Sequence, residues 1–338
     1  MLDHSKSNQT QVKVLTLHKD DSKKIIYFDQ KGWINLAKIY YGNPTKPEKK
    51  LLNKIIDASE NGSAIFPISM IHLSETNSIS KPHWRQQLSS LMAEISKCNT
   101  LTPYWPRILD IEIQNLILET LGFPHLNIFK YWLGKGIPHL IGLKPSVVSD
   151  EQIDPEVLKK LEKDLLKALD DPKSLEFILS KKFSDKTLEM DEINAVNEFE
   201  KIRTNLQNIK DNDLRRRFFL AHNITATITP RLVKTLINFK LPKEFINIII
   251  PQDDIEKFLM NLPTALVEFT LLYYRDQQLQ RPIEVNDIAD IWHLTLAIPY
   301  SDIVVTERMW ASISKQTKLD QKCNTIILSS ITELDGYL

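Results

Sequence analysis

Acidic side chains stand at two places in this 338-residue chain, one near each end. Near the start, Asp29 closes a β-rich run, and Glu75 follows seven residues after Ile68. Near the end, one short stretch holds four more acids, Asp287, Asp290, Asp302 and Glu307. Carboxylate oxygens are the ligands that Mg²⁺ and Mn²⁺ prefer, and a few of them can hold an ion that activates water against a phosphodiester bond. The six acids therefore point to a metal site with hydrolytic chemistry.

The C-terminal acids border one expected helix and one expected strand. Asp287 and Asp290 are three residues apart, so they share a helix face near the N-terminus, where the helix dipole favours anions. Asp302 begins the apolar run DIVVT, and Glu307 follows that run directly. A solvated acidic face is not usually interleaved with so much apolar sequence. We therefore expect a site here, although Asp287 also suits the N-cap of the helix.

Alternating strand and helix patterns near the start of the chain would bring Asp29 and Glu75 together. The expected elements are strands at 24–29 and 64–69 and helices at 33–41, 50–60 and 70–77. This alternation favours a parallel α/β sheet, whose ligands bind beyond the carboxyl ends of its strands. Taken singly, Asp29 equally suits a cap of the following helix, and Glu75 an ordinary surface position.

The middle of the chain differs from both ends. Residues 104–280 carry long amphipathic helical patterns and few strand signals, and the α/β pattern returns after Pro282. The expected C-terminal elements are a helix at 287–297, a strand at 302–306, a helix at 307–315 and a strand at 323–328. The sequence thus predicts one α/β domain from both chain ends, 23–103 and 281–338, with a helical insertion at 104–280 and a flexible segment at 1–22.

The order of these acids resembles the PIN-domain ribonucleases, the fold of VapC-type toxins. Asp29 stands at the end of the first strand and Glu75 in the helix after the second strand, as in that family. The stretch from Asp290 to Thr306 reproduces the family's spacing from its third acid to a strand-end Thr, and Glu307 takes the place of the fourth acid. The resemblance covers about residues 25–98 and 282–331, under half of the chain.

This resemblance implies a three-layer α/β/α nuclease domain with a central parallel sheet, and endonucleolytic hydrolysis of RNA by water that Mg²⁺ or Mn²⁺ activates. Asp29, Glu75 and Asp290 would hold the metal. Asp302 and Glu307 would complete the shell, and Asp287 fits a related variant with two aspartates at the helix start. The sequence departs from the family because Glu307 replaces the usual Asp or Asn, and because the central insertion is much larger.

Basic and aromatic residues near the expected crevice are candidates for contact with RNA. Phosphates attract Lys and Arg, and bases stack on aromatic rings. The residues expected to bind substrate are Lys81, Trp84, Arg85 and Arg308. His72, His293 and Thr306 lie beside the acids, and either hydrogen bonds to neighbours or a role in ordering water would suit them. Water activated by a metal requires no histidine.

Two other functions remain open from the sequence. Arg217 and His222 have the R-x-x-x-x-H spacing of HEPN-type ribonucleases, which need no metal, although this pattern arises easily by chance. Alternatively, a catalytically inactive PIN-like scaffold would bind RNA or protein through its helical part. The number of acids favours catalysis over a scaffold, because scaffolding does not require carboxylates at all of these positions.

The composition indicates the kind of environment and the kind of partner that we expect for this protein. The 43 basic and 43 acidic residues balance, so the chain as a whole lacks a basic nucleic-acid footprint. Two cysteines without metal-ligand spacing fit a reduced, cytoplasmic protein, and no apolar run approaches the ~18 residues of a membrane span. We expect an RNA substrate (tRNA, rRNA or mRNA), a protein partner or inhibitor on the helical part, and a toxin or defence setting. A homo-oligomer is compatible with these features.

Overall fold

A four-stranded parallel sheet, in the order β2-β1-β5-β6, forms the centre of the fold. The computed structural model describes residues 22–103, 105–143, 154–182, 186–250, 254–277 and 281–338. The strands are β1 (Lys24–Phe28), β2 (Ala64–Ile65), β5 (Ile303–Val305) and β6 (Ile326–Leu328). Phe28 pairs with Val305, so the two ends of the chain meet in the middle of the sheet, as the sequence predicted.

A second, two-stranded sheet extends this one on the β2 side. β3 (Asn99–Leu101) pairs antiparallel with β4 (Leu133–Lys135). Ile68, three residues past the end of β2, forms a parallel bridge to Thr100, and its backbone bonds to both Asn99 and Leu101. The expected strand at 64–69 is therefore a two-residue strand followed by this bridge, because Pro67 cannot donate to a ladder.

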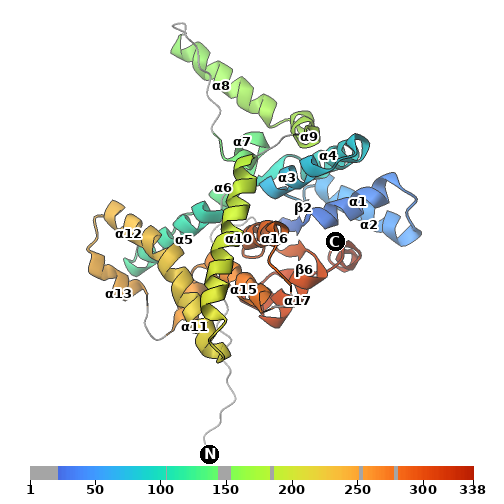
Figure 1. Ribbon diagram of the computed structural model, residues 1–338. Coiled ribbons are helices and arrows are strands. Elements are labelled where there is room, and N and C mark those ends of the chain that lie inside the picture. The colour runs from blue at the N-terminus through green and yellow to red at the C-terminus, as the bar shows by residue number, and fades with distance from the viewer. Residues whose placement is uncertain (1–21, 104, 144–153, 183–185, 251–253, 278–280) are drawn as a thin grey trace, which may run out of the picture.

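Residues on the central strand alternate between two hydrophobic cores, so helices cover both faces of the sheet (Figure 1). Ile26 and Phe28 face one core, and Ile25 and Tyr27 face the other. The helices that contribute to the first core include α1 (Gln30–Tyr41), α2 (Lys46–Glu60), α3 (Met70–Ser78), α4 (Pro82–Ser96), α7 (Gly136–Ile141) and α9 (Pro172–Ser180). Because these strands are buried on both faces, their sequences are nearly continuous apolar runs.

The second core joins the middle helices to the C-terminal part of the chain. It contains residues of α5 (Trp105–Thr120), α10 (Lys186–Leu206), α11 (Asn212–Asn223), α12 (Thr229–Asn238), α14 (Ile255–Met260), α15 (Pro263–Asp276), α16 (Val285–Ala297), α17 (Arg308–Gln316) and α18 (Leu319–Cys323). Among the short elements, η1 (Ile224–Ile228) joins α11 to α12, and η2 (Lys243–Phe245) and α13 (Ile246–Ile249) lie between α12 and α14. α6 (Phe129–Trp132) leads from α5 into β4, and η3 (Ile331–Gly336) follows β6 and adds Ile331 and Leu334 to the first core. α10 packs against α16, and α8 (Pro155–Leu169) extends away from the body (Figure 1).

Local signals set several boundaries differently from the sequence expectation. Asp29 caps α1 through Gly32, so this helix starts at Gln30, three residues early. Glu284 is the N-cap of α16, and Asp287 is its capping-box partner and not the cap itself. Cys323 ends a short helix, and β6 begins only at Ile326. Asn324 sits between them in a left-handed conformation with φ 53°, which breaks both patterns.

The boundaries of the parts at the ends of the chain stay a prediction. Residues 1–21 of the expected N-terminal segment lie outside the described residues. The expected insertion at 104–280 contributes β4 to a strand pair and shares the second core with Val304 and Trp310 of the C-terminal part. Within the described ranges, no helix is both long enough and apolar enough to cross a membrane.

Candidate metal centre

Asp29 and Glu307 follow the carboxyl ends of two neighbouring strands. Asp29 comes directly after β1, and its backbone N–H donates to Val305 O at 2.9 Å. Glu307 comes two residues after β5. Glu75 lies on α3, which follows β2, and Asp290 lies on α16, which precedes β5. The charges of Asp29 and Glu307 act on both of these side chains, so all four acids lie near one another. Four of the six predicted acids are therefore brought to one end of the parallel strands.

These acids share one electrostatic environment. Burial raises the pKa of Glu75 to about 8, and the charges of Asp290, Asp29, Glu192 and Glu307 add to the shift. Burial likewise raises the pKa of Asp290 to about 7, with Asp29, Glu307 and Asp287 adding to it although a hydrogen bond opposes it. The pKa of Asp29 rises to about 6, chiefly by burial. When all of these acids are ionised, they place excess negative charge at one end of the strands and repel one another.

Hydrogen bonds hold two of the acids in place, and a side-chain contact with Thr306 also acts on Asp29. Gly32 N donates to Oδ1 of Asp29 at 2.7 Å. The indole Nε1 of the fully buried Trp310 donates to Oδ2 of Asp290 at 2.9 Å. At the exposed border of the site, Lys31 Nζ lies 3.3 Å from Oε1 of Glu307. The fixed carboxylates thus lie inside, and the adjustable ion pair lies at the rim.

A layer of neutral aromatic groups lies beside the acids. The Tyr27 ring is 5.3 Å from the ring of His72 and 5.8 Å from that of His293. Burial lowers the pKa of both histidines to about 3, so both imidazoles are neutral. His72 accepts from Ser69 N at 2.9 Å and lies 2.9 Å from Phe28 O, which requires Nε2–H to be the donor. His72 is therefore a structural residue and not a general base.

His293 differs from His72 because its ring nitrogens make no hydrogen bond of normal geometry, and its polar contact is with the backbone of Ala289 on its own helix. The side chain is 2% exposed, and neither Nδ1 nor Nε2 has a partner of normal geometry among the described residues. Nε2 lies 4.0 Å from Oδ1 of Asp290, one turn away on the same helix. A buried polar group without a partner is costly, and such groups often mark functional sites. The ring of His293 therefore lies beside Asp290, one of the acids of the cluster.

The donor set has the chemistry of a Mg²⁺ or Mn²⁺ site, but its side chains are not drawn together. Buried carboxylates with raised pKa values lack compensating positive charge, which a divalent cation would supply. Within the described part of the chain, however, no three His, Cys, Asp or Glu side chains converge as metal ligands. The residues that would hold a metal are Asp29, Glu75 and Asp290, with Glu307 at the rim, and their side chains would have to move closer together to share one ion.

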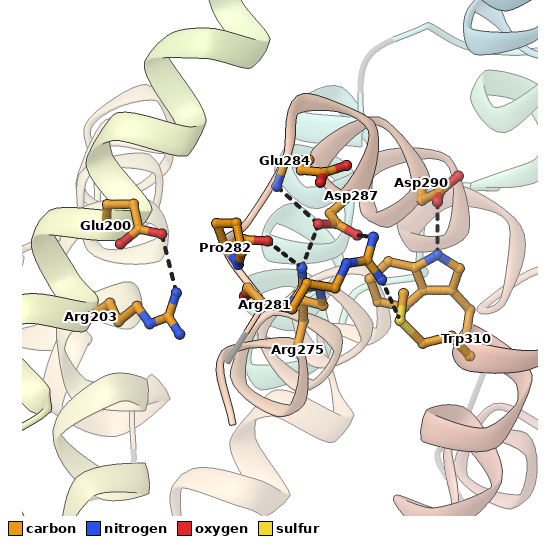
Figure 2. Close-up of polar contacts among 10 residues, drawn as sticks. Glu200, Arg203, Arg275, Arg281, Pro282, Glu284, Asp287, Asp290 and Trp310 are labelled. Carbon is orange, nitrogen blue, oxygen red and sulfur yellow. Dashed lines mark hydrogen bonds and ion pairs between the residues drawn. The ribbon is translucent and has the colours of Figure 1, made fainter. Parts of the chain in front are cut away.

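Asp287 is not part of this cluster of open carboxylates, which corrects its assignment as a metal ligand. Its Oδ2 lies 2.7 Å from Arg275 Nη2, and its Oδ1 lies 3.1 Å from Arg281 Nη2. Its Oδ2 also accepts from Glu284 N at 2.9 Å. Figure 2 shows Asp287 directed at the two arginines and Asp290 directed at Trp310. Both oxygens of Asp287 are thus engaged in holding the start of α16.

Asp302 lies at the amino end of the parallel strands, opposite the end where the other acids lie, which corrects its assignment to the metal shell. Its Oδ2 accepts from Ile25 N at 2.7 Å, at the amino end of β1. Four residue steps along a strand separate Asp302 from Thr306, a distance of about 13 Å. Asp302 therefore pins the start of β1 to the start of β5. A side chain at the amino end of a strand cannot join acids at the carboxyl end.

The residues expected to bind substrate divide into two groups. Arg85 is buried and donates to Ile79 O at 2.6 Å and to Ser180 O at 2.7 Å, so it braces the backbone instead of facing a ligand. Lys81, Trp84 and Arg308 are exposed. Arg308 begins α17 directly after Glu307, at the rim of the acids. Lys81 and Trp84 lie at the start of α4.

The side chains of Arg217 and His222, the alternative site, do not come together. Both residues are exposed on α11. A spacing of five residues separates their directions by about 140° around the helix axis. No hydrogen bond or ion pair joins the two side chains in the described structure. The neighbouring arginines are used locally, since Arg216 pairs with Glu256.

Two residues of the site were not expected from the sequence. Glu192 on α10 is 9% exposed and close enough to Glu75 to raise its pKa. Its surroundings in the sequence, EMDEIN, are typical of a solvated helix face, so no sequence signal distinguished it. Trp310 was also missed, although its place three residues after Glu307 put it on the first turn of a helix at the site.

In comparisons with known proteins, no family model, no curated protein and no solved structure matches this chain.

Proposed function

We propose that this protein is a metal-dependent endoribonuclease of the PIN-like kind, with a three-layer α/β/α nuclease domain and a large helical insertion. The observation that supports it most is the electrostatic coupling of Asp29, Glu75 and Asp290, which come from the two ends of the chain. Their order along the chain and their position past the strand ends agree with the motif that the sequence carries. The unpartnered His293 beside Asp290 adds a second reason to expect a ligand here.

Each residue has a distinct task in this proposal. Asp29 and Asp290 are the fixed carboxylates, because the Gly32 N–H and the Trp310 indole hold one oxygen of each. Glu75 is the adjustable carboxylate, and it loses its proton at working pH when positive charge is nearby. A bound Mg²⁺ or Mn²⁺ would activate water and stabilise charge on the scissile phosphate. Lys31 and Arg308, at the rim beside Glu307, are placed to contact phosphates.

The deciding experiment is cleavage of total cellular RNA with Mn²⁺, followed by mapping of the cut ends. We expect 5′-phosphate and 3′-hydroxyl ends, and loss of at least about 100-fold in rate in Asp290→Asn, since each such interaction is worth a few kcal/mol in a transition state. Asp287→Asn is the matched control on the same helix, and an equal loss of rate per folded molecule in it would contradict the site.

The alternatives give different results. Cleavage that survives EDTA but fails in His222→Ala would replace this proposal with the metal-independent one. Absence of cleavage of any RNA with Mn²⁺ present, together with tight RNA binding, would instead support a catalytically inactive scaffold. Metal binding measured by calorimetry on the Asp29→Asn and wild-type proteins separates the two, because a scaffold needs no carboxylate-dependent Mn²⁺ binding.

A further inference from the structure

Two helices that carry acids of the candidate metal centre also border an open groove. The groove has a volume of about 820 Å³ and lies between α1 and the turn from α3 into α4. Asp29 caps α1, and the first groove residue of that helix, Ile34, lies five residues further on, about 8 Å along the axis. Glu75 lies three residues before Ser78, the first groove residue of α3. The groove therefore begins about one helical turn from the acids.

We propose that this groove binds unpaired nucleotides of a single-stranded RNA whose backbone crosses the candidate metal centre. The proposal rests on the proposed function and adds the form of the substrate and the place where it lies. It assigns the aromatic side chains of the groove to the bases. It assigns the lysines of the groove to the phosphates.

The aromatic residues of the groove are available for stacking. Trp84 is 52% exposed. Tyr41, which also lines the groove, is 39% exposed, and its ring lies 4.7 Å from that of Tyr40. The five other tryptophans, Trp33, Trp105, Trp132, Trp292 and Trp310, are buried or pack against the second core. A half-exposed indole in a hollow is therefore unusual in this protein. Every base has a π-face, so aromatic rings bind single strands with little dependence on sequence.

The charge of the groove favours a polyanion over an apolar protein segment. Its lining includes Lys38, Lys81 and His83 and has no acidic side chain. Within the described residues, no ion pair involves Lys38 or Lys81. Cations that are not neutralised by the protein can release counterions from a phosphate chain. A helix of another protein would cover the aromatic rings but would leave these charges without a use.

The Arg85 brace explains how Trp84 is kept on the surface. Arg85 Nη1 bonds to Ile79 O in the α3–α4 turn, and its Nε bonds to Ser180 O at the end of α9. These contacts fix the first turn of α4, so the preceding residue, Trp84, points out into the groove and cannot fold into the core. The sequence prediction of Arg85 as a substrate contact is thus replaced by a role in positioning its neighbour.

The test is RNA binding without cleavage. A labelled single strand of about ten nucleotides is titrated with the full-length protein in EDTA, and fluorescence anisotropy is read at several salt concentrations. We expect Trp84→Ala to weaken binding about 5- to 150-fold, because stacking of one base is worth about 1–3 kcal/mol. Lys38→Ala and Lys81→Ala should each lower the slope of log affinity against log salt by about 0.7. Phe123→Ala, which removes a similarly exposed ring (59%) elsewhere, is the matched control.

Two results would overturn the proposal. One is equal affinity of Trp84→Ala and wild type for the single strand, which would leave the groove to another occupant such as a protein. The other is a photo-crosslink from a thiouridine-substituted strand that maps to Arg215–Arg217 and not to α1 or α4. Failure of cleavage with Mn²⁺ is scored separately: it would remove the proposed function while Trp84-dependent binding would still assign the groove.

Discussion

Trp310 and Asp290 form a hydrogen bond of 2.9 Å that ties the helix after β5 to the helix before it. The indole is fully buried, and the carboxyl group is about one quarter exposed, so the bond joins the core of the protein to the candidate metal centre. Among the described residues, this is the one hydrogen bond between the Asp290 side chain and another helix. Asp290 therefore depends on Trp310 for its direction.

Replacing Trp310 with Phe should weaken metal binding more than it weakens folding. The substitution removes the donor to Asp290, and a hydrogen bond to a charged group is worth about 1.5–3 kcal/mol. We expect the Mn²⁺ dissociation constant to rise about 10- to 100-fold in calorimetry. Trp33→Phe is the matched control, because Trp33 is equally buried and its Nε1 makes no hydrogen bond among the described residues. Equal losses in the two variants would contradict the assigned role.

Asp287→Asn should damage stability and spare the site. The substitution removes the charge that balances the fully buried Arg275, and breaking a buried pair in this way costs about 3–5 kcal/mol. Urea unfolding measures the loss. Arg281→Met is the control, since the Arg281 side chain is 47% exposed and its pair with Asp287 should contribute less than about 1 kcal/mol. Unchanged stability in Asp287→Asn, with loss of Mn²⁺ binding, would restore Asp287 as a ligand.

The metal-free protein should lose stability as the pH rises from 7 to 8.5. The pKa of Glu75 is about 8 and that of Asp290 about 7, whereas carboxyl groups in an unfolded chain titrate near 4. The folded state then binds more protons than the unfolded state across this window, so the free energy of unfolding falls as protons leave. The buried Glu268, with a pKa raised by burial to about 8, adds a slope of the same sign.

Glu75→Gln isolates the contribution of the site to this pH dependence. At pH 8.5 in EDTA the variant should be more stable than the wild type by about 1–3 kcal/mol, because a repelling charge is gone. Mn²⁺ should stabilise the wild type most at high pH, since metal binding requires ionised carboxylates. The measurement is urea unfolding with EDTA or Mn²⁺. A wild type whose stability rises between pH 7 and 8.5 in EDTA would refute the linkage.

Asp302 substitutions should affect folding and leave cleavage unchanged. Asp302→Ala removes the acceptor of the Ile25 N–H, and a buried donor left without a partner costs about 1–3 kcal/mol. Asp302→Asn keeps an oxygen acceptor and should recover most of this loss. The cleavage rate per folded molecule and the Mn²⁺ affinity should match the wild type in both variants. A loss of Mn²⁺ binding in Asp302→Asn would show that the opposite sheet edge contributes to the site.

The sequence predicted the elements whose patterns are local. The apolar run before Asp29 formed β1, and the run DIVVT formed β5 beside it, because both are short β-rich segments that end at acids. The prediction for Asp302 was wrong, because an acid beside a strand can lie at its amino or its carboxyl end. Asp302 lies at the amino end, away from the other acids. The prediction for Asp287 was also wrong, because the partner Arg275 lies in a separate helix whose packing no local pattern encodes.

Tertiary packing accounts for the other differences. Arg85 looked like a free basic residue, but its carbonyl partners at Ile79 and Ser180 come from segments 6 and 95 residues away. The sequence around Glu192 is typical of a solvated helix face, but α10 packs against α16 and the Glu192 side chain is buried. Tertiary contacts of this kind leave no periodic trace in the chain, so local patterns could not show how Arg85 and Glu192 are packed.

The pairing of β1 with β5 also has a consequence for synthesis. Ile26 and Ile303 are neighbours in the sheet, and 277 positions separate them in the chain. At ribosomal speeds of about 5–20 residues per second, the second strand follows the first by roughly 14 to 55 s. Until then Asp29 and Glu75 have no Asp290 beside them. Under the proposed function, the set of acids would stay incomplete on a growing chain until Asp290 has been synthesised and β5 has paired with β1.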